Sequence, residues 1–184
     1  MSYQSQVLTF SHTDSVTEAK FSPDSNYIVT TSNDSTAKVW SSKSGKFLVS
    51  LKHTARVVTA NFSDDSARIV TSSEDKTAKL WGVKAGQLIA VLRHKDSVYS
   101  AKFSPDKNRI VTVSDDKTAK LWSAKSGQLL VTLEHDRIVN DGNFSSDSNY
   151  LITASGNIYS GKAVATLWDV KTGKQVRTFE HEDK

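Results

Sequence analysis

The side chains that could do chemistry in this chain recur at a fixed spacing. Each of the first three histidines precedes an aspartate by 22 residues and a tryptophan by 28, with serines and threonines between them. The sets are His12, Asp34 and Trp40; His53, Asp75 and Trp81; and His94, Asp116 and Trp122. A hydroxyl, an imidazole and a carboxylate are the parts of a hydrolytic triad. An active site normally occurs once, however, so a set repeated three times at one phase is interpreted as architecture, and we predict no catalytic residue.

The histidines invite a second reading, as metal ligands. Two more stand at His135 and His181, but none of the five has another histidine four residues away, and the chain has no cysteine. Equal phase would also place them on different structural units. No glycine-rich phosphate loop is present either. We therefore expect neither a metal nor a cofactor.

Composition narrows the class of protein further. The chain has 184 residues and a formal net charge of +4, with its lysines scattered rather than clustered. Scattered lysines argue against a nucleic-acid partner, and no apolar run is long enough to span a membrane. The polar N-terminus does not resemble a secretion signal, and the absence of cysteine fits a reducing compartment. We expect a cytoplasmic protein.

The organisation of the chain is an internal repeat. Tryptophans at 40, 81, 122 and 168 are separated by 41, 41 and 46 residues, and glycines at 45, 86, 127 and 173 keep the same rhythm. We divide the chain into four units, 10–50, 51–91, 92–132 and 133–179. A segment at 5–10 resembles one further outer strand.

Each unit has the pattern of four short strands. In the third unit, alternating or β-branched segments at 97–103, 109–114, 118–122 and 128–133 are separated by turns such as Ser104-Pro105-Asp106-Lys107. A lone four-stranded sheet cannot bury both of its faces, so each sheet must stack on its neighbours. The predicted fold is all-β.

These features together resemble the WD-repeat β-propeller family. The resemblance rests on units of about 40–45 residues, a histidine near the start of each unit and a tryptophan that closes its third strand. The dipeptide that names the family survives only as Trp168-Asp169. The resemblance implies a β-propeller built of four-stranded antiparallel blades, with four blades in this chain.

The resemblance also assigns a role to the repeated polar residues. In the family, the histidine, a hydroxyl of the second strand, the turn aspartate and the tryptophan form a buried hydrogen-bond chain. The hydroxyl stays open here: Thr30 or Ser32, Thr71 or Ser73, and Thr112 or Ser114. The third-strand lysines Lys38, Lys79 and Lys120 are expected to pack their stems and keep their ammonium groups in water.

Function is expected where the copies differ on one surface. WD-repeat propellers usually bind partners on the face formed by the loops that carry the histidines and aspartates. On this face the resemblance marks Thr17, Val58, Tyr99 and Asn140, five residues after each histidine, and Asn33, Glu74 and Asp115, just before each turn aspartate. Their variety fits a specific patch for a protein or peptide, with Tyr99 as its anchor. The alternative is that they are surface residues that differ without binding anything.

The fourth copy departs from the pattern. Trp168 arrives five residues late, which places an insertion within about 156–162, and no aspartate stands in the turn. The hydrogen-bond chain of this copy is therefore expected to be incomplete. The longer loop exposes Ile158 and Tyr159, either as a contact loop or as part of a degenerate end repeat.

The number of blades points to self-association. Four blades at the wedge angle of an eight-bladed ring sweep about half a circle, and two identical halves could close by two-fold symmetry. We predict a non-enzymatic scaffold that forms a homodimer and binds a protein or peptide on its assembled face. The alternative is a truncated or engineered fragment of a larger seven- or eight-bladed protein, because the sequence stops where a fifth repeat would begin. An enzyme-like propeller would need an inward cluster beyond Glu74 and Asp115.

Overall fold

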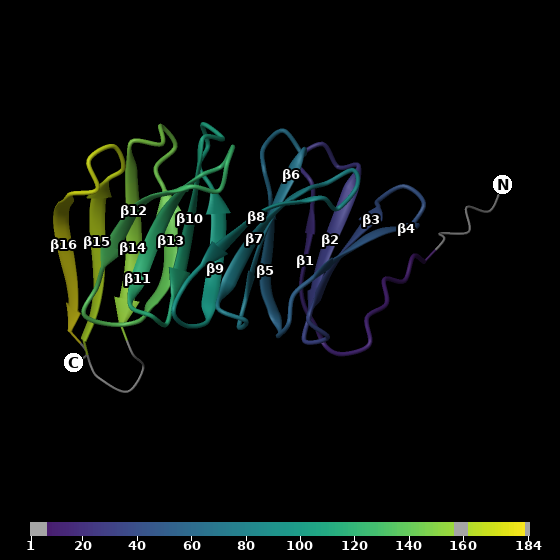
Figure 1. Ribbon diagram of the computed structural model, residues 1–184, viewed down its shortest axis with the longest axis horizontal. Coiled ribbons are helices and arrows are strands. Elements are labelled where there is room, and N and C mark those ends of the chain that lie inside the picture. Colours follow the sequence, from purple (N-terminus) through teal and green to yellow (C-terminus); the bar gives the residue numbers. More distant parts are fainter. Residues whose placement is uncertain (1–6, 157–161, 183–184) are drawn as a thin grey trace.

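The chain folds into four antiparallel sheets that stand side by side in sequence order (Figure 1). The computed structural model describes residues 7–156 and 162–182, and these ranges contain sixteen strands and no helix. Blade 1 comprises β1 (Val16–Phe21), β2 (Tyr27–Ser32), β3 (Thr36–Ser41) and β4 (Phe47–Lys52). Blade 2 comprises β5 (Val57–Phe62), β6 (Arg68–Ser73), β7 (Thr77–Gly82) and β8 (Leu88–Arg93). Blade 3 comprises β9 (Val98–Phe103), β10 (Arg109–Ser114), β11 (Thr118–Ser123) and β12 (Leu129–Glu134), and blade 4 comprises β13 (Val139–Phe144), β14 (Tyr150–Gly156), β15 (Lys162–Asp169) and β16 (Gln175–Glu182).

Every sheet is a simple meander in which each strand pairs with the next. The all-β fold of four-stranded antiparallel blades predicted from the repeat is confirmed. The second strand of blades 1–3 is the most enclosed, with five of the six residues of β10 buried. Such a continuous buried run is expected for a strand covered on both faces.

The hydrophobic core lies between the blades. Three clusters of buried residues form, one at each junction, and they use the same repeat positions. Between blades 2 and 3 the members are Val70, Ala78, Leu80 and Leu92 on one side and Val98, Ala101, Ile110, Trp122 and Ala124 on the other. Each blade thus turns its tryptophan toward the preceding blade and its outer-strand leucine toward the following one.

The first strand of each blade carries a bulge at the same position. The pairing register shifts at Thr17, Val58, Tyr99 and Asn140, so these residues lie outside the regular ladder. A bulge bends a strand and changes the direction of its side chain. These are the four positions that the sequence marked five residues after each histidine.

The glycine of the third turn is required for two reasons. Gly127 has a φ of +71°, a region that side chains disfavour, and a Cβ there would collide with Ala90 of the preceding outer strand. Gly86 stands in the same relation to Val49. The turn therefore forms part of the junction between neighbouring blades.

The predicted extra strand at 5–10 does not form over its described part. Residues 7–10 are in no strand, and residues 5 and 6 lie outside the described residues. The segment nevertheless packs like an outer strand: Leu8 lies against Gly45, and the ring of Phe10 lies 5.3 Å from that of Trp40. Leu8 and Phe10 occupy the repeat positions of Val49 and Leu51. The segment takes the place of an outer strand but has no neighbouring strand to pair with.

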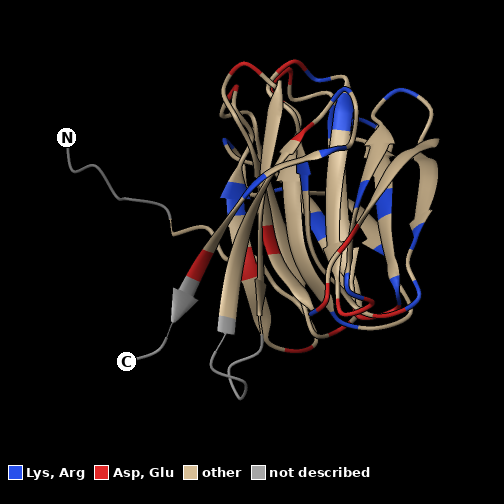
Figure 2. Cartoon of the chain, turned by 90° about the vertical axis from the view of Figure 1, so that its left-hand side faces the viewer, with Lys and Arg blue, Asp and Glu red and all other residues tan. Residues whose placement is uncertain are grey.

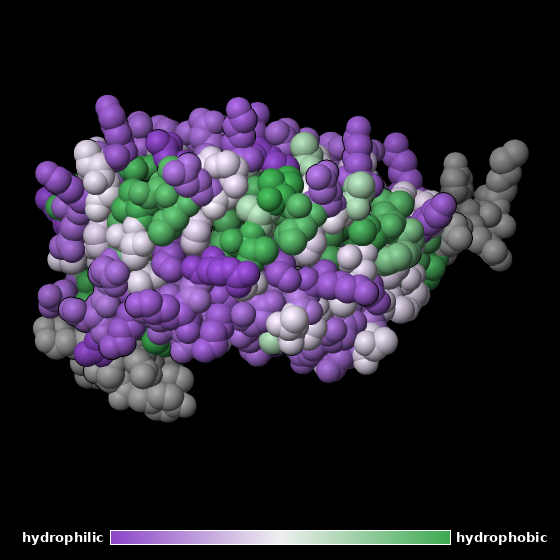
Figure 3. Space-filling view, viewed as in Figure 1, coloured by the Kyte–Doolittle hydropathy of each residue, from purple (hydrophilic) through white to green (hydrophobic). Residues whose placement is uncertain are grey.

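The outer rim shows a repeated apolar feature. Figure 3 shows three apolar patches over β12, β8 and β4, which carry the exposed pairs Leu129 and Leu130, Leu88 and Ile89, and Phe47 and Leu48. Lysines and arginines are spread over the strands and loops in Figure 2. Within the described ranges, no helix is long and apolar enough to cross a membrane.

The turn glycines provide a test of the junctions. Replacing Gly127 with alanine is expected to lower the free energy of unfolding by about 1–3 kcal/mol, because of the positive φ and the collision with Ala90. Gly82→Ala is the matched control, since a Cβ at Gly82 meets nothing within 4 Å, and its effect should stay within about 0.5 kcal/mol. Urea denaturation at fixed protein concentration measures both. Equal losses in the two variants would contradict this account of the turn.

Candidate functional site

A hydrogen-bond chain ties the loop end of blade 3 together. Asp116 Oδ2 lies 2.9 Å from His94 Nδ1, and His94 Nε2 lies 2.7 Å from Thr112 Oγ1. Trp122 Nε1 donates to the same hydroxyl at 2.8 Å. A carboxylate only accepts, so Nδ1 carries the proton of the neutral ring, Nε2 accepts, and Thr112 donates to it. The chain thus spans loop, turn and two strands.

Blades 1 and 2 repeat this arrangement, and the open choice of hydroxyl falls on threonine. Thr30 and Thr71 each receive the tryptophan indole at 2.9 Å and contact the histidine at 2.7 Å. The serine two residues later has another role. Ser32 Oγ accepts from the Asp34 backbone N–H and donates to the carbonyl of Asp14. It therefore stabilises the turn and takes no part in the hydrogen-bond chain.

The two titratable groups of this hydrogen-bond chain, a histidine and an aspartate, are held in different charge states. Burial lowers the pKa of His94 to about 4, against the opposing influence of Asp116. Burial raises the pKa of Asp116, but hydrogen bonds from Thr118, the Lys95 backbone and His94 outweigh that effect and lower it to about 2. The histidine is neutral and the aspartate ionised near neutral pH. With both ring nitrogens engaged, the arrangement serves as a fastener and lacks a free base.

Sequence reasoning missed two further contributors to this end of each blade. Thr118 Oγ1 donates to Asp116 Oδ1 at 2.6 Å, a contact that Thr36 and Thr77 repeat. The third-strand lysines add a contact that the sequence did not reveal: at the exposed surface, Lys120 Nζ donates to the backbone carbonyl of Arg93 at 3.0 Å. These threonines and lysines recur at the same 41-residue spacing as the tryptophans, and that spacing could have indicated their structural role.

Blade 4 keeps only part of this hydrogen-bond chain. His135 Nε2 lies 2.8 Å from Thr153 Oγ1, and Trp168 Nε1 donates to that hydroxyl at 2.9 Å. In place of an aspartate, the backbone carbonyl of Leu133 accepts from His135 Nδ1 at 3.0 Å. Among the described residues no buried side-chain nitrogen or oxygen is left without a partner. The blade has therefore lost its aspartate without leaving the histidine unsatisfied.

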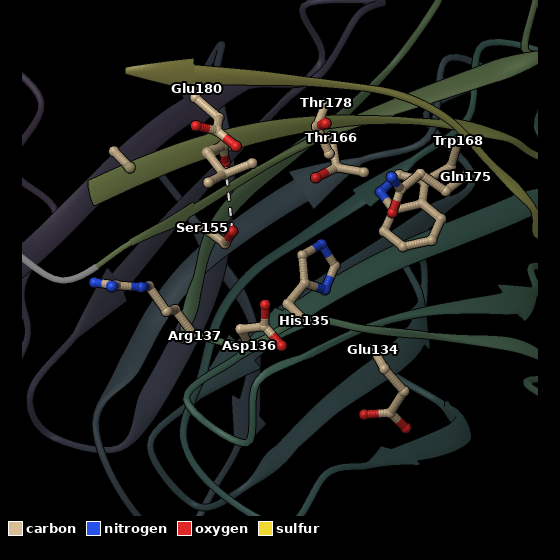
Figure 4. Close-up of a pocket in the computed structure, with 12 residues that line it drawn as sticks. Glu134, His135, Asp136, Arg137, Ser155, Thr166, Trp168, Gln175, Thr178 and Glu180 are labelled. Carbon is tan, nitrogen blue, oxygen red and sulfur yellow. Dashed lines mark hydrogen bonds between the residues drawn. The ribbon is translucent and has the colours of Figure 1, made fainter. Parts of the chain in front are cut away.

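A cavity of about 430 Å³ opens in blade 4 beside this incomplete chain (Figure 4). Its walls come from the β12–β13 connection and from β14, β15 and β16. Trp168, Thr166 and Thr178 lie at one end, and Arg137 and Glu180 lie at the other. Glu134 and Asp136 add two carboxylates. The cavity is thus walled by an aromatic ring and three acidic side chains, with one arginine.

Tyr99 is the centre of a second candidate site, on the loop face. Its hydroxyl donates to Asp115 Oδ2 at 2.7 Å, and this bond, with burial and the nearby carboxylates of Asp115, Glu74 and Asp96, raises the pKa of Tyr99 to about 12. The structure therefore gathers three of the predicted contact residues, Glu74, Tyr99 and Asp115. Glu74 is exposed and lies 3.3 Å from Arg56.

The other predicted contact residues are placed differently. Thr17 Oγ1 donates to the carbonyl of Val57 at 3.0 Å, which ties blade 1 to blade 2. Asn140 donates to the carbonyl of Gly156 at 3.1 Å. Asn33 is exposed and Val58 is half-buried. Ile158 and Tyr159 lie outside the described residues.

No metal centre is assembled in the part of the chain that the structure describes, where no group of three or more histidine and carboxylate side chains could hold an ion. Stacked four-stranded sheets, each fastened at one end by a histidine–threonine–tryptophan chain, define a propeller-type repeat protein.

Comparison with known families identifies that class. The profile described as "WD domain, G-beta repeat" matches residues 4–41, 45–82 and 86–123, more than half of the chain, and the protein belongs to this family. All of blade 4 lies outside the matched stretches. The family and the fold support a propeller scaffold of the protein-interaction type.

Among solved structures, the chain is similar to a computationally designed protein, Ika8, at 30% identity and a TM-score of 0.79. The similarity covers 91% of this chain and 50% of the designed one, so the chain spans about half the length of that relative. No curated protein matches the chain.

The buried histidines predict a pH dependence of stability. In the unfolded chain His94 takes up a proton below about 6.5, whereas in the fold it does so only near 4, so the unfolded state binds more protons between these values. His53 and His135 shift in the same direction because of burial. The free energy of unfolding should therefore fall as the pH drops below 6.5, and the contribution of His94 should fall by up to about 1.4 kcal/mol per pH unit down to pH 4. Below pH 3.8, protonation of Asp116 in the unfolded chain lowers the free energy of unfolding further.

Urea denaturation across this pH range checks the prediction. His94→Gln is the matched variant: it should be less stable overall, with a pH slope shallower by about one proton. A stability that stays constant from pH 7 to 5 would show that the histidines titrate equally in both states.

Proposed function

We propose that this protein is a non-enzymatic scaffold that associates with a second copy of itself through its two open blade faces. The observation that carries the proposal is the exposure of core positions at the two ends. Val16 of blade 1 is 49% exposed, whereas its equivalents Val57, Val98 and Val139 are fully buried. Ile152 of blade 4 is 40% exposed, whereas its equivalent Val111 is 1% exposed.

The two open faces are complementary halves of one repeated junction. The exposed face of blade 4 carries Ile152 and Phe179 at the positions through which Val111 and Leu133 contact the next blade. The exposed face of blade 1 carries Val16 and Phe21 at the positions of Val57 and Phe62. A second copy offers the matching face at each end, and two-fold symmetry satisfies both ends at once.

The comparison with the designed protein supports this stoichiometry. The four blades cover 50% of that chain, so a second set of equal length is needed to match it. The same coverage is compatible with the alternative that the sequence is a segment of a longer array, and the oligomeric state separates the two.

A substitution on the open face of blade 4 tests the association. Light scattering is expected to give twice the chain mass of 20.2 kDa for the wild type and the chain mass itself for Ile152→Asp. An aspartate cannot be buried unpaired in the junction, and the dissociation constant should rise by a factor of about 100 or more. Circular dichroism checks that the variant stays folded.

Val176→Asp is the matched control. Val176 lies in β16 of the same blade and is 52% exposed, but its equivalents Leu48, Ile89 and Leu130 belong to the rim rather than to a junction. This variant should keep the mass of the wild type. A wild-type protein that remains a monomer at high concentration would overturn self-association and favour the longer array.

We also propose that the loop face binds a protein segment or peptide, with Tyr99 as the anchor. Three observations support this: the ring is held by its bond to Asp115, it sits at a bulge that turns it out of the ladder, and Glu74 and Asp96 lie nearby. A rigid tyrosine with polar neighbours is typical of binding hot spots.

Peptides selected from a library on the wild-type protein provide the test. Tyr99→Ala is expected to weaken their binding by about tenfold or more. Leu130→Ala, on the rim, is the control and should leave the affinity unchanged. Peptides that bind Tyr99→Ala as tightly as the wild type would contradict this site.

A further inference from the structure

The cavity of blade 4 lies where the other three blades place a lysine side chain. Lys38, Lys79 and Lys120 each reach from the third strand to a backbone carbonyl at the end of the preceding outer segment. The ammonium groups donate to the carbonyls of Ser11, Lys52 and Arg93 at 2.8, 2.8 and 3.0 Å. The next carbonyl in this series belongs to Glu134, which lines the cavity.

The lysine also uses the tryptophan of its own blade. Lys79 Nζ lies 5.8 Å from the centre of the Trp81 ring, and Lys120 Nζ lies 5.9 Å from that of Trp122. At this range a cation is attracted to the face of an indole ring. Each of these two blades therefore contains a site for one ammonium group, formed by an indole and a carbonyl.

Blade 4 keeps the site and lacks the lysine. Thr166 pairs with Thr153 as Lys120 pairs with Thr112, so a threonine occupies the position of the lysine. Val164, opposite Glu180, stands where Thr118 stands opposite Glu134. Both substitutions shorten or remove polar side chains, and the space left behind contains the indole of Trp168 in its wall (Figure 4).

The charges around the cavity favour a cation. Glu134, Asp136 and Glu180 line it, against Arg137, which lies at the end away from Trp168 in Figure 4. His135 adds no charge near neutral pH, because burial lowers its pKa. The formal charge of the lining is therefore negative.

We propose that this cavity receives a lysine side chain from a protein partner, with the ammonium group between the indole of Trp168 and the backbone carbonyl of Glu134. The geometry of Lys79 and Lys120 in the same chain is the template. The site lies on the side of blade 4 that faces blade 3, because Trp168 packs in the junction between these two blades. It is thus separate from the open face, and the inference does not depend on self-association.

Titration with the methylamide of Nα-acetyl-lysine tests the proposal. The four indole N–H resonances are followed by NMR, and that of Trp168 is expected to shift saturably in the millimolar range while those of Trp40, Trp81 and Trp122 stay in place. The Nε-acetylated analogue, which lacks the charge, should bind about tenfold more weakly or worse.

Two variants test the site in opposite directions, one by filling it and one by opening its equivalent in blade 3. Thr166→Lys supplies the missing side chain from within the chain, and should abolish the response of Trp168 to the amine. Lys120→Thr should open the equivalent site in blade 3, so that Trp122 begins to respond as well. The second variant keeps the proposal testable if the first does not fold.

The outcomes are distinct. A saturable response confined to Trp168, lost in Thr166→Lys, would establish the site whatever the oligomeric state of the protein. Absence of that response in the wild type, or an undiminished response in folded Thr166→Lys, would overturn the inference. A folded Lys120→Thr protein in which Trp122 ignores the amine would overturn the lysine template.

Discussion

The apolar junction between neighbouring sheets is the interaction on which this structure depends. A single meander of four strands buries neither face, and each fully buried valine, leucine or isoleucine contributes about 1.5–3 kcal/mol. The other repeated features protect this junction. Gly127 lets the turn approach Ala90 closely, and the chain from His94 to Trp122 fastens the loops over the edge of the core. Polar residues that look like catalytic parts are therefore the fasteners of a hydrophobic stack.

The architecture could be predicted from the sequence because the residues that form each junction recur with the period of the sequence repeat. The period of 41 residues set the number of sheets and placed histidine, aspartate and tryptophan in one constellation. It could not choose between Thr30 and Ser32, since residues two apart point to the same side of a strand and differ only by one step along it. It also could not show that Phe10 packs on Trp40 without a strand forming, because an outer strand needs a neighbour to accept its hydrogen bonds, and residues 7–10 have none beside them.

That N-terminal segment bears on the proposed association of two copies. Leu8 and Phe10 already cover Gly45 and Trp40, the places that an outer strand of a preceding blade would cover. In a closed ring the partner's β16 would place its own side chains at these positions. Either the N-terminal segment or the partner's β16 would then have to give way. In the proposed dimer, the free energy of association would then be the difference between two similar contacts rather than the whole of a junction. Under that proposal, the N-terminal segment would cover part of the open face of blade 1 in the monomer and would be displaced on association.

Blade 4 shows which parts of the repeat can be lost without harm to the stack. Its aspartate is absent, yet the carbonyl of Leu133 accepts the hydrogen bond of His135 in its place. Trp168 stays as buried without a lysine above it as Trp81 does with one, and its bond to Thr153 remains intact. Since an unsatisfied buried group would cost about 1–3 kcal/mol and a vacated ammonium site at the surface costs less, the second kind of loss is tolerated. A binding site can therefore arise in a repeat protein by deleting a surface contact of the scaffold while its buried hydrogen bonds remain complete.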